Sequence, residues 1–447
     1  MGPARGNEPS LFLLFRESGA PEIQKHQANE TANRVLFPAV SGWLAARSAR
    51  GFCNTVVPMP TVRVRLPARP QNYEIKIDAG SLRNLGPAVR ACLGNGARRA
   101  ALISDRTVFK LYGRSVTESL RGAGLAVNHL LIGEGERHKS FRSLEKTVAF
   151  LSQNKLERND VVVALGGGVV GDVAGFAAAV YLRGIAFVPA PTTLLAQIDA
   201  SAGGKTGINL PAGKNLAGAF HQPRLVYIDA DTLQTLPARD ITSGWCEAVK
   251  QGAAGSRKLF DQTVAVLRKG GADFSLWLRE RQSQTDICAT IAAHCRFKAS
   301  IVSGDERESL TRSDRHSRRI LNFGHTTAHA LETVTGYRRF RHGEAVGYGI
   351  LVAAEISKSL GMLAPGELES IREAVALCGP LPRADDLAVT QIAKAMAGDK
   401  KSMAGSLQWV LLERIGRAQI VDSSEIKPRV LADALRVGLR RVRTGKR

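Results

Sequence analysis

The stretch Val161–Pro223 decides the fold of this chain; it reads VVVALGGGVVGDVAGFAAAVYLRGIAFVPAPTTLLAQIDASAGGKTGINLPAGKNLAGAFHQP. Its first five residues are apolar, and such a run bounded by glycine predicts a buried strand of a parallel sheet. The glycine-rich turn Gly166–Asp172 follows. Glycine lets the backbone approach a ligand closely, and the next helix offers free N–H groups and its positive dipole end. The stretch therefore predicts an α/β unit with a ligand site at the end of this strand.

The spacing of Gly166, Gly168 and Gly171 fits the dinucleotide fingerprint, although a tight turn that binds nothing has the same pattern. Residues further along favour a site. Thr192 and Thr193 follow a second apolar run, where their hydroxyls could bond a cofactor. Two lysines, each beside a glycine, suit an anionic ligand pressed against the backbone, and these are Lys205 and Lys214.

At this point the chain resembles the 3-dehydroquinate synthase family of the shikimate pathway. The blocks that carry the resemblance are GGGVVGDVAGF, PTTLLAQIDASAGGKTGIN and GKNLAGAFHQP, and the likeness extends from about Tyr73 to about Ile420. It implies an α/β fold: an N-terminal parallel-sheet nucleotide-binding domain and a C-terminal, mainly α-helical, metal-binding domain. It also implies NAD and one divalent metal, Zn or Co, as cofactors.

The composition is that of a globular α/β protein of two or three domains, with 447 residues, 44% of them apolar, and 44 glycines. No run approaches the 18 apolar residues of a membrane span. Six scattered cysteines without a CxxC pair favour reduced thiols in the cytoplasm. Cys288, His294 and Cys295 lie in an apolar helical pattern, so we interpret them as core residues and not as metal ligands. The net charge of +22 is dispersed and lacks a recognition motif, so we predict an acidic small substrate and no nucleic acid.

Three segments are expected along the chain. Residues 1–58 are an unstructured extension or a mis-started reading, 59–240 are the NAD-binding domain, and 241–447 are the helical domain. Alternating residues predict strands at 62–66 and 73–77, and an apolar run predicts one at 100–103. Residues 407–420 suit a small strand pair, and the basic tail from Lys427 suits a helix.

Asp105 follows the strand at 100–103, where a carboxylate can accept ribose hydroxyls. It lies upstream of the glycines, so the site is not of the standard Rossmann order. The resemblance adds Glu136 and Lys139, which without it would be a solvated helix start. The full set of implied cofactor residues is Asp105, Glu136, Lys139, Gly166, Gly167, Gly168, Gly171, Asp172, Thr192, Thr193, Lys205, Lys214 and Thr235.

A second cluster of polar residues begins at Glu247 and Lys250, which are three apart and share a helix face. Alone they would be a surface ion pair. His325 and His329 lie on one face of a later helix, and His342 begins another. Two histidines and a carboxylate suit Zn²⁺ and leave one coordination position open.

The resemblance implies that Glu247, His325 and His342 are the metal ligands and that His329 transfers protons. The implied catalytic residues are His329, Lys205, Lys250, Arg318, Asn322 and Glu308. The implied substrate residues are Arg183, Asp199, Lys205, Asn215, Lys250, Arg318, Asn322, His329 and Lys400, with Lys401 as the alternative to Lys400.

The chain departs from the family before Arg318. The family places a glutamate closer to this arginine, whereas Glu308 here lies ten residues before it, and segment 309–317 is about six residues longer. Either Glu308 keeps its role on a longer loop, or Asp314 replaces it, or the alignment slips. The extra arginines predict a mobile, basic loop that attracts an anionic substrate.

The implied reaction converts 3-deoxy-D-arabino-heptulosonate 7-phosphate to 3-dehydroquinate and phosphate. It proceeds by transient oxidation with NAD, β-elimination of phosphate, re-reduction, ring opening and intramolecular aldol closure. A homodimer in the cytoplasm that contacts no membrane is expected. The alternatives are another sugar phosphate cyclase that acts on sedoheptulose 7-phosphate, and a glycerol dehydrogenase-like, metal-dependent NAD dehydrogenase.

Overall fold

The computed structural model describes residues 72–270, 274–309, 311–399 and 407–440. The strands are β1 Glu74–Asp78, β2 Arg99–Asp105, β3 Ala126–Ile132, β4 Val161–Gly166, β5 Ala186–Pro191, β6 Lys205–Leu210, β7 Gly213–Phe220, β8 Leu225–Asp229, β9 Gln408–Arg414 and β10 Arg417–Asp422. The first helices are α1 Leu85–Leu93, α2 Arg106–Val108, α3 Arg114–Gly122, α4 Phe141–Gln153 and α5 Gly168–Val180. The others are α6 Ala238–Gly255, α7 Arg257–Gly270, α8 Phe274–Trp277, α9 Arg281–Gly304, α10 His325–Val334, α11 His342–Ser359, α12 Pro365–Leu377, α13 Val389–Asp399 and α14 Pro428–Gly438.

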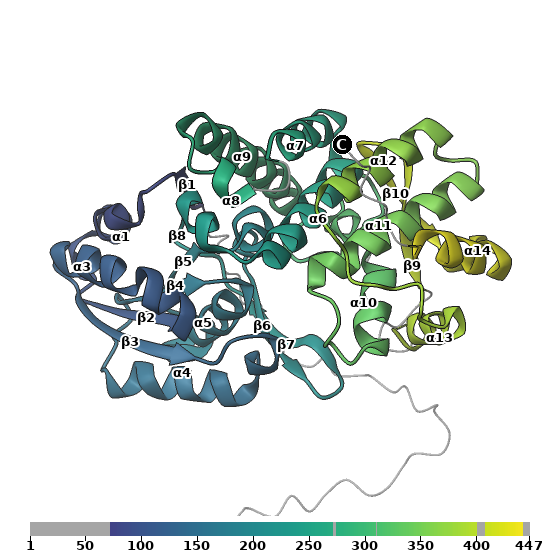
Figure 1. Cartoon of the computed structure of the whole chain (residues 1–447). Helices are drawn as coiled ribbons and strands as arrows, with labels where there is room; N and C mark the ends of the chain where they lie inside the picture. The colour runs from purple at the N-terminus through teal and green to yellow at the C-terminus, as the bar shows by residue number, and fades with distance from the viewer. Residues whose placement is uncertain (1–71, 271–273, 310, 400–406, 441–447) are drawn as a thin grey trace, which may run out of the picture. The chain divides into compact units, whose positions relative to one another are not determined.

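A parallel sheet of order β3-β2-β4-β5 lies in the N-terminal half of the described chain (Figure 1). All six residues of β4 are buried, because helices cover both faces of the sheet. Val161, Val163 and Leu165 pack with residues of α1 and α3, while Val162 and Ala164 pack with residues of α4 and α5. The continuous apolar run follows from this two-sided burial, and the predicted buried strand is confirmed.

Two smaller pairings flank the sheet. β1 pairs with β8 in parallel, and β6 pairs with β7 as an antiparallel hairpin. The sequence does not predict this hairpin, because its glycine-rich stretch lacks a clear apolar alternation. Figure 1 shows the β6–β7 hairpin, in teal, directed away from the sheet.

The helical part of the chain begins with α6 at Ala238, near the expected start of the helical segment at 241. Helix α11 is buried along nearly its whole length and packs against α6 and α10. The strand pair expected at 407–420 is confirmed as β9 and β10, and the predicted tail helix is confirmed as α14. The strand expected at 62–66 and the extension expected at 1–58 lie outside the described residues. In the part of the chain that the structure describes, no helix has the length and apolarity of a membrane span.

Candidate functional site

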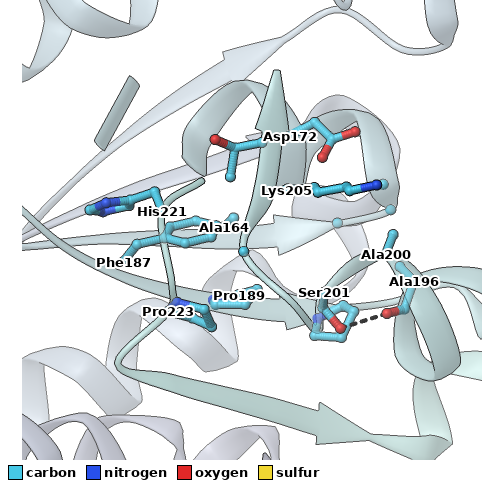
Figure 2. Close-up of a pocket in the computed structure, with 17 residues that line it drawn as sticks. Ala164, Asp172, Phe187, Pro189, Ala196, Ala200, Ser201, Lys205, His221 and Pro223 are labelled. Atoms are coloured by element: carbon cyan, nitrogen blue, oxygen red, sulfur yellow. Dashed lines mark hydrogen bonds between the residues drawn. The ribbon is translucent and has the colours of Figure 1, made fainter. Parts of the chain in front are cut away.

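A pocket lies at the glycine-rich turn between β4 and α5. Gly166, Gly167, Gly168, Gly171 and Asp172 all line it, as five of the predicted cofactor residues. A side chain at Gly168 would meet only the β-carbon of Ala200, at 3.7 Å, and one at Gly171 would meet nothing within 4 Å. The pocket is therefore a cradle of bare backbone at a helix N-terminus, which fits the diphosphate of a dinucleotide. Figure 2 labels the side chains of Asp172 and Lys205 among the residues that line it.

Lys139 connects this turn to the hairpin. Its ammonium pairs with the Asp172 carboxylate and donates a hydrogen bond to Asn215 Oδ1. Lys139 is 6% exposed, so the alternative of a solvated helix start is wrong for this residue. Asn209, which the sequence analysis missed, accepts from Asn215 N at 2.9 Å and donates to Glu136 Oε1 at 2.8 Å.

The remaining predicted cofactor residues are arranged in two ways. Thr192 and Thr193 follow β5 beside the turn: Thr192 N donates to Gly166 O, and the Thr193 methyl lies against Gly167. Lys205 lines the pocket, whereas Asp105, Lys214 and Thr235 do not. Asp105 caps α2 by accepting from Val108 N at 2.8 Å, and burial raises its pKa. Thr235 bonds the Tyr112 hydroxyl at 2.6 Å.

A second site joins the three predicted metal ligands, which lie on three different helices. Potential ligand atoms of Glu247 on α6, His325 on α10 and His342 on α11 all lie within 4.8 Å of one another. Glu247 Oε1 is 3.9 Å from His325 Nε2 and 3.5 Å from His342 Nε2. This Oε1 atom is buried and accepts no hydrogen bond from any described residue. An unsatisfied carboxylate oxygen facing two imidazoles fits a divalent cation such as Zn²⁺.

Two glycines let the ligand-bearing helices approach one another. A β-carbon at Gly343, the residue after the ligand His342, would lie 1.9 Å from Ser243 O of α6. A β-carbon at Gly349 would lie 1.9 Å from the carbonyl of Gly324, immediately before α10. Because any side chain would separate these backbones, glycine at both positions is required for the three ligands to meet.

The charges around the three ligands are buried. Glu247 and Lys250 are each 1% exposed and form an ion pair of 2.6 Å, so the alternative of a surface ion pair is wrong. Burial would lower the pKa of Lys250, but the carboxylates of Glu247 and Asp199 outweigh it and raise the pKa. Burial and the charge of Lys250 hold the pKa of His325 well below its usual value, which keeps the ring neutral for ligation.

His329 lies one helical turn after His325 and faces both histidine ligands. The His329 ring centroid is 5.5 Å from that of His325 and 6.2 Å from that of His342. His329 therefore lies beside the three-ligand group without belonging to it.

Lys298 on α9 was missed by the sequence analysis. It is buried, and its ammonium lies 2.6 Å from Asp199 Oδ1 and donates to Asp199 O. Burial alone would raise the pKa of Asp199, but Lys298 and Lys250 hold it well below its usual range. No motif surrounds Lys298, and the only available signal was a lysine on an otherwise apolar helix face. Cys295 and His294 nearby are buried core residues, as predicted, and do not belong to the three-ligand group.

Glu308 contacts two predicted substrate residues. Its carboxylate pairs with Lys205 Nζ and accepts from Asn322 Nδ2 at 3.1 Å. Glu308 has a φ of 55°, an uncommon conformation for a residue other than glycine. Asp314 instead pairs with Arg312 and is exposed. Of the three alternatives for this segment, the geometry favours Glu308 on a longer loop.

Arg318 is buried behind this contact. Its guanidinium donates to Gly203 O at 3.0 Å and to Glu306 O at 2.5 Å. Arg318 is therefore held by one backbone carbonyl just before β6 and one just after α9. Arg183 does not join the group, since no hydrogen bond or ion pair links it to the other described substrate residues; it lies in a short 3₁₀ turn with a φ of 67°. Lys400 and Lys401 lie outside the described residues.

Two family profiles match adjacent segments of this chain. The family profile described as 3-dehydroquinate synthase N-terminal matches residues 129–243, and the C-terminal profile matches residues 244–402. A 3-dehydroquinate synthase of Nitrobacter hamburgensis is 43% identical over 385 residues, which is 84% of this chain and 95% of the relative. One of Pelotomaculum thermopropionicum is 43% identical over 366 residues, or 81% and 93%.

Solved structures share the fold. The 2-epi-5-epi-valiolone synthase of Streptomyces hygroscopicus subsp. jinggangensis 5008, which has NAD⁺ and Zn²⁺ bound, has a TM-score of 0.73 at 26% identity, over 84% of this chain and 99% of its own. A probable glycerol dehydrogenase of Sinorhizobium meliloti 1021 has a TM-score of 0.56 at 16% identity, over 83% and 98%. At that identity the second likeness is one of fold alone.

The identity to curated relatives, over nearly their whole length, favours the predicted lyase activity over the cyclase and dehydrogenase alternatives. It also confirms the predicted α/β fold with a helical C-terminal region. The chain belongs to the 3-dehydroquinate synthase family.

Proposed function

We propose that this chain converts 3-deoxy-D-arabino-heptulosonate 7-phosphate to 3-dehydroquinate and phosphate, with NAD and one divalent cation as cofactors. The observation that carries the proposal is the position of the three metal ligands. Glu247 of this group contacts Lys250, and Asp199 links Lys250 electrostatically to Lys298. A metal beside buried ammonium groups suits a substrate that is both an alcohol and an anion.

The glycine turn holds the dinucleotide in this proposal. The first N–H groups of α5 bind its diphosphate, and Lys139 fixes Asp172 at the edge of the pocket. When bound, NAD⁺ accepts and returns a hydride, and the divalent cation, held by Glu247, His325 and His342, acts as a Lewis acid.

Lysines and an arginine bind the anionic groups of the substrate. Lys205 is 48% exposed at its side chain and faces the pocket, and we assign it and Arg318 to the carboxylate or phosphate. Glu308 orients Lys205 and Asn322 through its two oxygens. We also assign Lys250, Asp199, Asn215, Arg183 and Lys400 to the residues that bind the substrate.

His329 moves protons. It lies beside the metal ligands but is not one of them, and imidazole titrates near neutral pH. This position lets it deliver and remove protons at hydroxyls of a substrate bound to the cation.

The test is phosphate release from the heptulosonate phosphate with Zn²⁺ or Co²⁺ and a substoichiometric amount of NAD⁺. We expect one phosphate per substrate consumed and no net gain in NADH absorbance. Net accumulation of NADH would mean a dehydrogenase of the glycerol dehydrogenase type. Turnover of sedoheptulose 7-phosphate in place of the heptulosonate would mean a different cyclase.

We further propose two domains, divided at 240 and 241, and a cytoplasmic homodimer. The boundary between the two family matches, at 243 and 244, supports the division. Light scattering should give twice the mass of the chain.

A further inference from the structure

Glu332 on α10 is a buried carboxylate next to the metal ligands. It is 2% exposed, and its Oε1 lies 3.3 Å from Nδ1 of His342. The other ring nitrogen of His342, Nε2, faces Glu247 Oε1 at 3.5 Å. The imidazole of His342 is therefore held between two carboxylates, one on each nitrogen, and only Glu247 belongs to the three-ligand group.

Lys214 contacts the same carboxylate from the other half of the molecule. It lies on β7, and its Nζ is 2.9 Å from Glu332 Oε1. The ammonium also lies 4.7 Å from the ring centroid of Tyr337, which contributes a cation–π contact. The predicted role of Lys214 was cofactor binding, but it does not line the glycine pocket. The structure instead places its charge on Glu332, where it offsets the cost of a buried carboxylate.

We propose that Glu332 is a positioning residue of the metal site: it accepts the Nδ1–H of His342, turns the Nε2 lone pair toward the cation, and is itself held by Lys214 of the β6–β7 hairpin. The reason is general. A metal-binding histidine that donates its second N–H to a carboxylate is fixed in tautomer and ring orientation and becomes a more basic ligand. This inference rests on the metal site proposed above.

A structural role is the competing explanation. Lys214 and Glu332 also tie the hairpin to α10, so removing either one weakens that contact whether or not a cation is present. Metal affinity separates the two roles, because a contact that only holds the hairpin does not set the orientation of the His342 ring.

The test measures Co²⁺ affinity and the visible spectrum of the Co²⁺ site in chelator-treated protein, without NAD or substrate. The variants are Glu332→Ala, Glu332→Gln, Lys214→Met and the double variant Glu332→Ala with Lys214→Met. His342→Ala is the reference for the site itself. Glu355→Gln is the matched control: Glu355, like Glu332, is a buried acid paired with a basic side chain, here Arg372, and it lies on α11, which carries His342.

We expect Glu332→Ala to weaken Co²⁺ binding about 10- to 100-fold and to alter the spectrum, as for other outer partners of metal-bound histidines. Glu332→Gln should lose less, because its amide oxygen still accepts from Nδ1–H. Lys214→Met should lose the least, and the double variant should lose no more than Glu332→Ala, since both act through one contact. Glu355→Gln should bind Co²⁺ like the unaltered protein.

Three results would overturn the proposal. One is unchanged affinity and spectrum in both Glu332 variants while His342→Ala loses the metal. Another is an equal loss in Glu355→Gln, which would make the effect one of stability. The third is a fully additive loss in the double variant. Retention of Co²⁺ by His342→Ala would instead refute the metal site, and with it the proposed function of these residues. If Glu332→Ala does not fold, the isosteric variant Glu332→Gln and the variant Lys214→Met, at a partly exposed position, still test the proposal.

Discussion

The glycine pocket and the metal site are built by opposite means. All residues that line the pocket come from one stretch, 164–223, and five of them are glycines, which leave backbone exposed. The metal ligands come from three helices, between residues 247 and 342, and the site consists of side chains alone. A backbone site is sensitive to added atoms, whereas a side-chain site is sensitive to removed atoms and to the packing that aligns them. The predictions below test this contrast, beginning with the largest effect.

Removing a ligand should destroy the metal site. We expect His325→Ala and His342→Ala to purify without metal and to show no measurable turnover, because two remaining ligands hold a cation weakly. Metal content by elemental analysis checks this. Stoichiometric zinc in both variants would refute the assignment of these ligands.

His329→Ala should separate chemistry from binding. We expect it to keep full metal content and to lower kcat by about 10²- to 10⁴-fold, the usual contribution of a proton-transferring group. Metal analysis and steady-state kinetics on the same preparation provide the measurement. Loss of the metal would make His329 a ligand, and unchanged kcat would remove it from the mechanism.

Gly168→Val should block the pocket by adding atoms. The new side chain has room for its β-carbon next to Ala200, so the fold should persist while the space for the cofactor is filled. We expect NAD affinity to fall by about tenfold to hundredfold, the scale of an overpacking cost. Calorimetric titration measures it, with a normal circular dichroism spectrum as the condition.

Gly122→Val is the matched control for this variant. Gly122 also lies in a helix, and a side chain there would meet nothing within 4 Å. It should bind NAD normally. Unchanged NAD affinity in Gly168→Val would place the cofactor elsewhere.

The buried His294 should make the free energy of unfolding depend on pH. Burial holds the pKa of His294 at about 3, against 6.5 for the model compound, and Gln251 and Thr263 flank its ring at 3.0 and 3.1 Å. Below pH 6.5 the unfolded chain therefore binds a proton that the folded chain does not. This contribution to stability is complete above that pH and is lost toward pH 3, by up to about 1.4 kcal/mol per pH unit.

Urea unfolding of the metal-free protein between pH 7 and pH 4 measures this contribution of His294. His294→Gln should be less stable at pH 7 but should have a flatter dependence on pH. The exposed His129, changed to Gln, is the control and should leave the slope unaltered. An equal slope in His294→Gln and the unaltered protein would contradict the prediction.

The smallest predicted effects test whether Glu308 or Asp314 has the catalytic role. We expect Glu308→Gln to lower kcat/KM by about tenfold or more, because Lys205 and Asn322 lose a charged partner. Asp314→Asn should change it by less than about twofold, since its partner Arg312 is a surface contact. Steady-state kinetics at two salt concentrations measure both. The reverse order would assign the catalytic role to Asp314.

The sequence by itself determined the local features of this protein. The strand at 161–165, the glycine turn, the start of α5 and the placement of His325 and His329 on one helix face depend on residues a few positions apart. Backbone preferences and the helical period settle such features locally, so a pattern in the chain is enough to predict them. The blocks of the 3-dehydroquinate synthase family supplied the pairing of Glu247 with two distant histidines.

Only the tertiary structure decided which distant side chains meet. Lys298 reaches Asp199 across 99 positions, Lys214 reaches Glu332 across 118, and Glu308 reaches Lys205 across 103. None of these pairs has a spacing that marks it, because the intervening chain is folded into other elements. The first two pairs are largely buried, and a lysine and a carboxylate that contribute little at the surface become strongly coupled once helices remove water from around them. Burial is a property of the packed molecule, so the charges around the metal and the role of Glu332 follow from the fold and not from the motif.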